Sequence, residues 1–447
     1  MFQIFRNAFR VPDLRRRILF TLFALVIFRL GAHIPVPYLV PGAMKEFLSG
    51  GGLDLFSLFN TFTGGAFEQA TVFALGVSPY INASIIVQLL TVAIPALERL
   101  SKEGVEGRKK INKITRYLGI ILALVQGAGL YVTLYNMGFD PAGGANRLIA
   151  NTTALGFSTI VLTFTAGTAF IVWLGEQITE KGLGNGVSMI IFAGIIVGIP
   201  GGITSLYQNF LGAGVSVAGI AKFAGIAILA ILAITFVVLF NQAERRIPVQ
   251  YAKRVVGRKM YGGQNTNIPI KVVMGGVMPI IFASSIMAFP ATIVRLMNGG
   301  AMPQSGVWYY VLGCLSAGLA KEWWTSVVYA VIYFLLILFF TYFYSSIQFN
   351  PVELANNIQK QGGSIPAIRP GKPTSDYISR VSSRLNFAGA IFLGIVAIMP
   401  VVLGAVFKVP SLQIGGTSLL IMEGVALETV QQIESQMTMR HYKGFLE

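Results

Sequence analysis

Residues 217–240 read VAGIAKFAGIAILAILAITFVVLF, and Lys222 is the only charged residue among them. An α-helix needs about 20 apolar residues to cross the roughly 30 Å of hydrocarbon in a bilayer, and this stretch is long enough. The composition of the whole chain agrees, because 54% of its 447 residues are hydrophobic and only 12% are charged, against about 25% in a typical soluble domain. The sequence therefore predicts a membrane protein and excludes a water-soluble fold of this size.

Nine further stretches have a similar length and apolar character. The ten are residues 18–35, 70–95, 117–137, 152–174, 184–200, 217–240, 272–296, 326–344, 387–407 and 416–435. The first follows three arginines, residues 15–17, as a signal peptide would, but no small-residue cleavage site comes after it, so we interpret it as a retained helix. The predicted fold class is an all-α polytopic membrane protein with ten transmembrane helices.

The net charge of +16 falls almost entirely on one side of the predicted membrane. The N-terminus, the loops after the second, fourth, sixth and eighth stretches, and the C-terminus hold 27 of the 34 Lys and Arg residues. Cytoplasmic loops carry such an excess of Lys and Arg. Both termini are therefore predicted to lie in the cytosol. If one transmembrane helix were missed or wrongly added, every later loop would change sides and the excess of Lys and Arg on one side would be lost.

Few candidates exist for a charge in the membrane interior, and we find only Arg29 and Glu423. Ion-coupled transporters keep acids, histidines or lysines near mid-membrane, where ions bind, so a pump or symporter is disfavoured. We expect Arg29 to snorkel toward the outer interface. We expect Glu423 to face water or a partner, because an unpaired acid in lipid costs at least about 2.5 kcal/mol.

No metal, cofactor or nucleotide site is predicted. The single cysteine, Cys314, and the distant histidines His33 and His441 form neither a disulfide framework nor a metal-binding motif. The glycines of residues 182–186 lack the GxGxxG spacing, and in the sequence PGKP of residues 370–373 prolines occupy positions that a phosphate-binding loop needs as glycine and Ser or Thr. Energy for any transport must therefore come from elsewhere.

Two predicted cytosolic loops, residues 241–271 and 345–386, are too long to be simple connectors. Loops beyond about 15 residues are usually functional or disordered. The alternation in RRIPVQYAKR, residues 245–254, predicts a strand or hairpin, and the Gly and Pro residues of 362–371 predict a fixed turn. A protruding basic surface of this kind can bind ribosomal RNA phosphates or an acidic protein; the alternative is a solvated loop.

Two further segments have open interpretations. Residues 53–67 are too short in apolar length to cross the membrane, and they are either a re-entrant half-helix or an amphipathic helix lying flat on the outer surface. In the second stretch, apolar and polar side chains recur every three or four residues and share one helix face. Polar groups on such a face most often hold a neighbouring helix, and the seventh stretch offers a matching pair of serines, Ser284 and Ser285.

Several long motifs, in order along essentially the whole chain, resemble those of the SecY/Sec61-alpha family. They are FALGVSPYINASIIVQLL at 73–90, WLGEQITE at 173–180, GNG at 184–186, RRIPVQYAKR at 245–254 and IRPG at 368–371. The family provides the central subunit of the protein-conducting channel, the Sec translocase. The resemblance implies two inverted five-helix halves, residues 1–200 and 201–447, around an hourglass pore.

The resemblance also implies roles for individual residues. The pore ring would be Val77, Ile81, Val187, Ile191, Ile281 and Ile421. The plug, within residues 53–67, would include Leu53, Phe56, Phe59, Phe62, Gly64 and Gly65. The lateral gate, between the second and seventh helices, would be a polar seam of Ser84, Gln88, Thr91, Gln126, Ser284 and Ser285. Glu423 departs from the apolar residue expected near the pore.

Docking and partners follow from the same resemblance. The contacts with the motor or the ribosome would be Arg245, Arg246, Lys253, Arg254, Arg258, Lys259 and Arg369. The expected partners are the subunits SecE and SecG, the motor ATPase SecA, the ribosome, signal peptides with the secretory chains that follow them, and anionic lipids. The protein would be a passive channel in the bacterial inner membrane, without enzyme activity or a cofactor. The rival interpretations are a small-solute secondary transporter and a membrane insertase scaffold without a pore.

Overall fold

Each of the ten predicted stretches overlaps a helix in the structure, which is a computed structural model that describes residues 8–40, 60, 63–138, 148–211, 217–251, 254–256, 259–261, 265–297, 306–315, 323–407 and 410–443. The ten helices are α2 (Pro12–Gly31), α5 (Ser78–Ala93), α7 (Val105–Gly138), α8 (Ala154–Lys181), α9 (Gly186–Leu211), α10 (Val217–Gln242), α11 (Met278–Met297), α13 (Trp323–Gln348), α15 (Lys372–Phe407) and α16 (Pro410–Lys443). Three shorter helices are α6 (Pro95–Lys102), α12 (Val307–Leu315) and α14 (Pro351–Lys360).

By length and composition, six of the described helices can each cross a membrane. The number rises to seven if α5 and α6, bent by 105° at the break between them, count as one span. Helices α2, α11 and α16 are not among these helices, and in α11 the apolar stretch that the structure describes is Met278–Ala291. The helical membrane class is thus confirmed, while the number of ten crossings stays a prediction.

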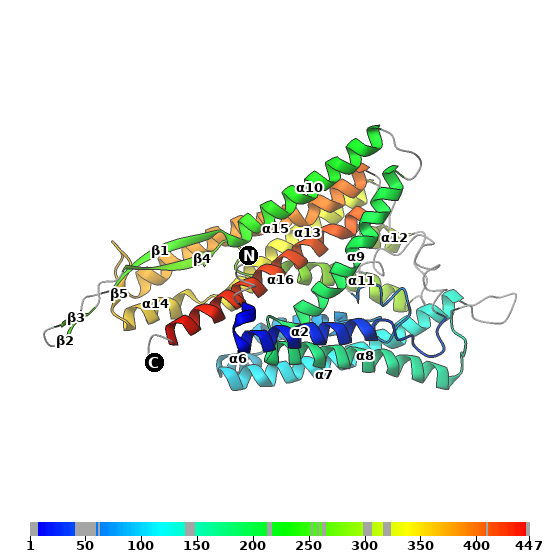
Figure 1. Cartoon of the computed structure of the whole chain (residues 1–447), viewed down its shortest axis with the longest axis horizontal. Coiled ribbons are helices and arrows are strands. Elements are labelled where there is room, and N and C mark those ends of the chain that lie inside the picture. Colours follow the sequence, from blue (N-terminus) through cyan, green and yellow to red (C-terminus); the bar gives the residue numbers. More distant parts are fainter. Residues whose placement is uncertain are drawn as a thin grey trace.

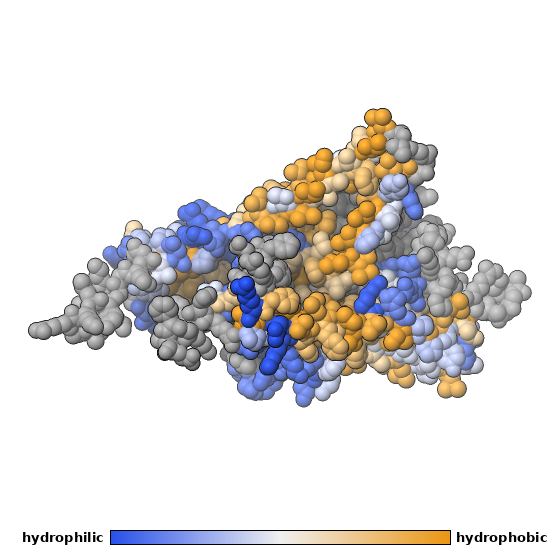
Figure 2. Space-filling view, in the orientation of Figure 1, coloured by the Kyte–Doolittle hydropathy of each residue, from blue (hydrophilic) through white to orange (hydrophobic). Residues whose placement is uncertain are grey.

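The helices form two groups that follow the order of the chain. In Figure 1, α2, α7 and α8 run side by side in one group, and α10, α13, α15 and α16 form a second group at an angle to it. Helix α9 runs from the first group to the second, where it contacts α10 and α16. Figure 2 shows hydrophobic residues over α10 and the middle of α2, and hydrophilic residues over β1 and the beginning of α2.

The second predicted stretch begins with turns instead of helix. Helix α5 starts only at Ser78, with Pro79 in its first turn, where the missing N–H of proline costs no hydrogen bond. Before it, the backbone of residues 70–72 pairs with that of residues 34–36, through Val36 N–H to the Ala70 carbonyl at 2.9 Å and Val72 N–H to the Ile34 carbonyl at 3.0 Å. The prediction of helix from residue 70 was therefore wrong by about two turns.

The two predicted cytosolic loops fold together into one body. Strands β1 (Glu244–Tyr251) and β4 (Asn265–Lys271) pair antiparallel, which confirms the predicted hairpin, and β5 (Gly363–Ser364) pairs with β1. A separate ribbon joins β2 (Arg254–Val256) and β3 (Lys259–Tyr261). Aliphatic residues from β1, β4, α14, α15 and the position directly after β5 share a buried core: Ile247, Val249, Ile270, Ile358, Ile365 and Ile378. We call this body, residues 244–271 with 349–385, the platform.

Candidate functional site

All six predicted pore residues lie in one hydrophobic cluster between the two helix groups, which we call the central cluster. Four helices supply them: Val77 and Ile81 come from α5 and the residue before it, Val187 and Ile191 from α9, and the others from α11 and α16. Val77, Ile191, Ile281 and Ile421 are each less than 9% exposed, and Ile81 and Val187 are partly buried. The structure thus brings together residues from both halves of the chain and presents no polar group among these six.

The described part of the predicted plug lies against the same cluster. Ala66 is fully buried in the central cluster, and residues 63–70 form a tight turn, which we call the 63–70 turn. Gly64 and Gly65 both have positive φ, at 65° and 87°, in the left-handed region that favours glycine. Leu53, Phe56, Phe59 and Phe62 lie outside the described residues.

The predicted polar seam does not form hydrogen bonds between helices. Gln88 donates to Ser84 at 3.3 Å within α5, and Thr91 donates to the carbonyl of Val87 at 2.7 Å. Ser284 donates to a carbonyl of its own helix α11 at 3.0 Å. In the described part of the chain, none of the six residues predicted for this seam, Gln126 and Ser285 included, bonds across α5 and α11.

Apolar contact replaces the expected seam. Ile85 of α5 is buried in a hydrophobic cluster whose other members, including Ile280 and Ala283 of α11, come from the C-terminal half. The Oε1 atom of Gln88 is buried, with no hydrogen-bond partner in the structure. In this structure the described hydroxyl and amide groups of the predicted seam bond within their own helices, because such groups can bond the turn before them, and their role in a lateral gate stays a prediction.

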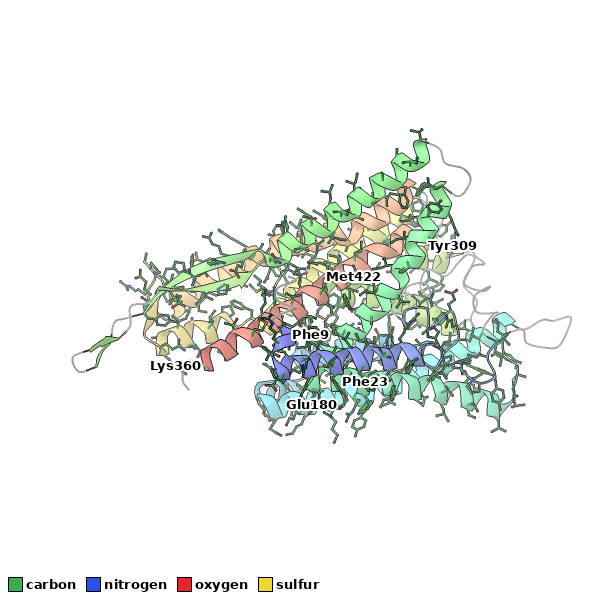
Figure 3. The ribbon with its side chains drawn as sticks, viewed as in Figure 1. Phe9, Phe23, Glu180, Tyr309, Lys360 and Met422 are labelled. Atoms are coloured by element: carbon green, nitrogen blue, oxygen red, sulfur yellow. The ribbon has the colours of Figure 1, made fainter. Side chains whose placement is uncertain are left out.

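Glu423 lies on the side of α16 opposite the pore residue Ile421 and bonds a residue of α10. It lies two residues after Ile421 on α16, which places the two side chains about 200° apart around the helix; Met422, between them in the sequence, marks this part of α16 in Figure 3. Glu423 is 8% exposed, and its Oε2 accepts a hydrogen bond from Nδ2 of Asn241 at 2.9 Å. Its Oε1 has no partner in the structure. The sequence predicted that Glu423 faces water or a partner, and in the structure the Asn241 amide of α10 bonds this acid.

Removing Asn241 should harm the fold more than removing both members of this pair. Asn241→Leu leaves both carboxylate oxygens of Glu423 buried without a donor, and an unsatisfied buried polar group costs about 1–3 kcal/mol. The double variant Asn241→Leu/Glu423→Leu removes the orphaned group and should regain most of that loss. Thermal unfolding of the detergent-solubilised complex measures both, and a double variant less stable than Asn241→Leu would contradict the pairing.

The predicted docking residues that can be placed lie on the platform. Arg245 and Arg246 are exposed at the start of β1, and Arg246 Nε pairs with Glu244 Oε1 at 2.7 Å. Arg369 is exposed in the turn before α15, where its carbonyl accepts a hydrogen bond from Thr374 Oγ1 at 2.8 Å. Lys253 and Arg258 lie outside the described residues, and only the backbone is described for Arg254 and Lys259, in β2 and β3.

Sequence reasoning missed several polar links that join distant segments. Lys271 at the end of β4 donates to Gln431 of α16 at 2.8 Å, and the next residue of α16, Gln432, accepts from the backbone N–H of Gly184. Arg116 of α7 pairs with Glu176 of α8 at 3.1 Å. Nothing local in the sequence marks these pairs. Among the described residues, no group of three or more His, Cys, Asp or Glu side chains could hold a metal.

Comparison with known proteins decides the family, because the SecY family model matches residues 71–430. The chain belongs to the SecY family. It is 44% identical over 453 residues to the protein translocase subunit SecY of Streptomyces scabiei, and 45% identical over 465 residues to that of Mycobacterium tuberculosis strain ATCC 25618 / H37Rv. Both matches cover 100% of each chain.

Solved structures of SecY and Sec61 channels have the same fold. A protein-conducting channel is similar with a TM-score of 0.66 at 21% identity, over 94% of this chain and 92% of that one. Sec61 from a canine ribosome–channel complex of the endoplasmic reticulum is similar with a TM-score of 0.63 at 20% identity, over the same shares. At these identities the likeness establishes the SecY-type fold for this chain.

Proposed function

We propose that this chain is the channel subunit of a protein translocase, through which unfolded secretory polypeptides cross the membrane. The observation that carries the proposal is the gathering of six aliphatic side chains, from four helices of both halves, in one buried cluster. Relatives that match the whole chain are named protein translocase subunits. Flexible aliphatic groups can close around a passing chain of any sequence and leave ions without polar ligands.

The proposed halves are residues 1–200 and 201–447, which would separate along α5 and α11 to form a lateral gate. Support comes from the apolar contact near Ile85, where no hydrogen bond between the predicted seam residues must break. An incoming hydrophobic segment would replace one apolar neighbour by another and could then leave into lipid. Such an exchange of similar contacts suits a gate that must be bistable.

The plug is proposed to be residues 53–67, closing the channel from the outer side. Its support is the position of Ala66 in the central cluster and the turn that begins at Gly64. When a polypeptide enters, the plug moves away and the aliphatic side chains seal around the polypeptide instead. A small-solute transporter would need a polar binding site at mid-membrane, and the six central side chains offer none.

The platform is proposed to dock the ribosome or the motor ATPase SecA, which would supply the energy that this non-enzymatic channel lacks. Its support is the exposure of Arg245, Arg246 and Arg369 on a body with its own aliphatic core. We further propose SecE and SecG as accompanying subunits, signal peptides as ligands of the lateral gate, and anionic lipids near the basic helix ends. The chain would lie in the bacterial inner membrane with both termini in the cytoplasm.

Crosslinking of a stalled secretory chain tests the proposed path. With a photo-crosslinking amino acid at Ile81 or Ile191, we expect strong crosslinks to the stalled chain, because both residues belong to the central cluster. The control position is Leu232 of α10, which is 63% exposed on the apolar outer surface and should crosslink to lipid. Crosslinks confined to Leu232 would contradict a central channel and favour an insertase scaffold.

A further inference from the structure

Arg29 forms a contact that the proposed function does not use. It lies in the last turn of α2, at the end opposite the three arginines that mark the predicted cytosolic side. Its Nη1 donates a hydrogen bond of 2.7 Å to the carbonyl of Gly64, and its side chain is half-buried. Among the described residues, no carboxylate pairs with Arg29, so this backbone carbonyl is the acceptor that the structure provides for a charged guanidinium.

Gly64 also lies close to α9. A methyl group added to its Cα would lie 3.0 Å from the Cα of Gly194 and 3.4 Å from Nη1 of Arg29. Gly194 follows Ile191 by three residues, so both lie on the same face of α9. The backbone of Gly64 therefore fills a narrow space between the Arg29 guanidinium and the helix that carries two of the six aliphatic residues.

The rest of the 63–70 turn is closed on itself. Asn60 accepts hydrogen bonds at its carbonyl from Gly65 N–H at 2.9 Å and from Thr63 Oγ1 at 3.2 Å, and its side chain bonds both the backbone and the carboxylate of Glu68. Such a network makes the turn a compact unit. The end of the turn at Ala70 is held by the bond from Val36 N–H at 2.9 Å, so the bond from Arg29 fixes the opposite end, at Gly64.

We infer that Arg29 is a positioning residue that holds the 63–70 turn over the outer end of the central cluster in the closed channel. The inference rests on the proposed function, since it gives the plug a fixed root. Hydrogen bonds from a charged donor are roughly twice as strong as neutral ones. Arg29 thereby links α2 to α9 through Gly64, and opening the channel requires this bond to break.

The test measures ion leak through the complete complex, reconstituted with its partner subunits in vesicles without substrate. Arg29→Met keeps an unbranched apolar stem and removes the donor, and we expect the resting leak to rise about tenfold, the effect of losing one charged hydrogen bond. Arg29→Lys should restore part of the seal. The control is Arg16→Met, an exposed arginine of the same helix, which should leak like the unaltered chain.

Two further variants separate a positioning role from a structural one. Gly64→Ala disturbs the same contact from the other side, so it should leak like Arg29→Met, and the double variant should leak no more than either single one. Additive leaks, or a silent Arg29→Met in a fully assembled complex, would overturn the inference. If Arg29→Met fails to assemble, the resting leaks of Gly64→Ala and Arg29→Lys test the positioning role in its place.

The proposed function has a separate control in this assay. Ile191→Ser/Ile281→Ser places hydroxyls in the central cluster and should raise the leak whether or not Arg29 acts as inferred. If this variant leaks and Arg29→Met does not, the positioning role fails while the channel stands. If neither the serine variant nor Arg29→Met leaks, the channel assignment itself fails.

Discussion

Arg369→Glu is expected to reduce motor-driven translocation by roughly 100-fold, because reversing a charge at a docking contact replaces attraction by a repulsion of several kcal/mol. The backbone at Arg369 is fixed by the hydrogen bond from Thr374 and by the neighbouring Ile368, which packs against the platform core. The exposed side chain can therefore change without disturbing the fold.

The matched control for this prediction is Arg380→Glu. Arg380 is also an exposed arginine of the platform region, one turn or more into α15, and its Nε bonds only the carbonyl of Asp376 in its own helix. Transport of a secretory precursor into inverted membrane vesicles, driven by the motor and ATP, measures both variants. Equal losses in the two would point to a general effect of net charge, and unaltered transport in Arg369→Glu would remove the docking assignment.

Gly167→Ala is expected to lower the free energy of unfolding by about 3 kcal/mol or more, at the upper end of the cost of overpacking. A methyl group at Gly167 of α8 would lie only 2.0 Å from the carbonyl oxygen of Val72. The backbone there cannot move aside easily, because Val72 is already bonded to Ile34 at 3.0 Å. The substitution should separate α8 from the segment that leads into α5.

Gly198→Ala of α9 is the control, since among the described residues no atom beyond its chain neighbours and its own helix backbone lies within 4 Å of the added methyl group. Alanine in a helix interior is about 1 kcal/mol more favourable than glycine, so this variant should be neutral or slightly stabilising. Thermal unfolding in detergent, followed by tryptophan fluorescence, compares the two. A Gly167→Ala variant as stable as Gly198→Ala would mean that α8 and the crossing segment do not pack this closely.

The helices were predictable because their signal is local. A run of apolar residues forms a helix in a membrane whatever its neighbours are, since each backbone group must be satisfied within its own segment. The error at residues 70–77 has a tertiary cause at its start: residues 70–72 pair with residues 34–36 of another segment, and a window along the sequence does not contain that partner.

The platform shows the same limit on a larger scale. The alternation of residues 245–254 predicted the β1 strand, but Gln250 also pairs with Ser364, more than a hundred residues away. Neither loop alone shows that its aliphatic residues complete a shared core. This long-range pairing forms because the packed helices bring the two segments together. A local sequence pattern cannot predict that arrangement.

The candidate site divides in the same way. The six aliphatic residues could be placed together only through the resemblance to a family, because branched residues one turn apart on a helix are ordinarily packing. The contacts of Arg29 and Glu423 were not predictable, since each charged side chain is satisfied by a group from a different segment, the Gly64 carbonyl and the Asn241 amide.

Helix α15 has a mechanical consequence for the whole molecule. Its 36 residues span roughly 54 Å at 1.5 Å per residue, from the platform core at Ile378 to the apolar cluster of the C-terminal half at Phe392 and Val396. Its backbone is helical along that length, and the interior proline Pro400, which removes one helical hydrogen bond, lies only in its last turns. The part before Pro400 therefore behaves as a stiff rod between the platform and the apolar cluster. A tilt of roughly 5° at its first turn moves Ile398, which packs against the apolar cluster, by roughly 3 Å, so a small torque on the platform becomes a displacement of atomic size among the helices of the C-terminal half.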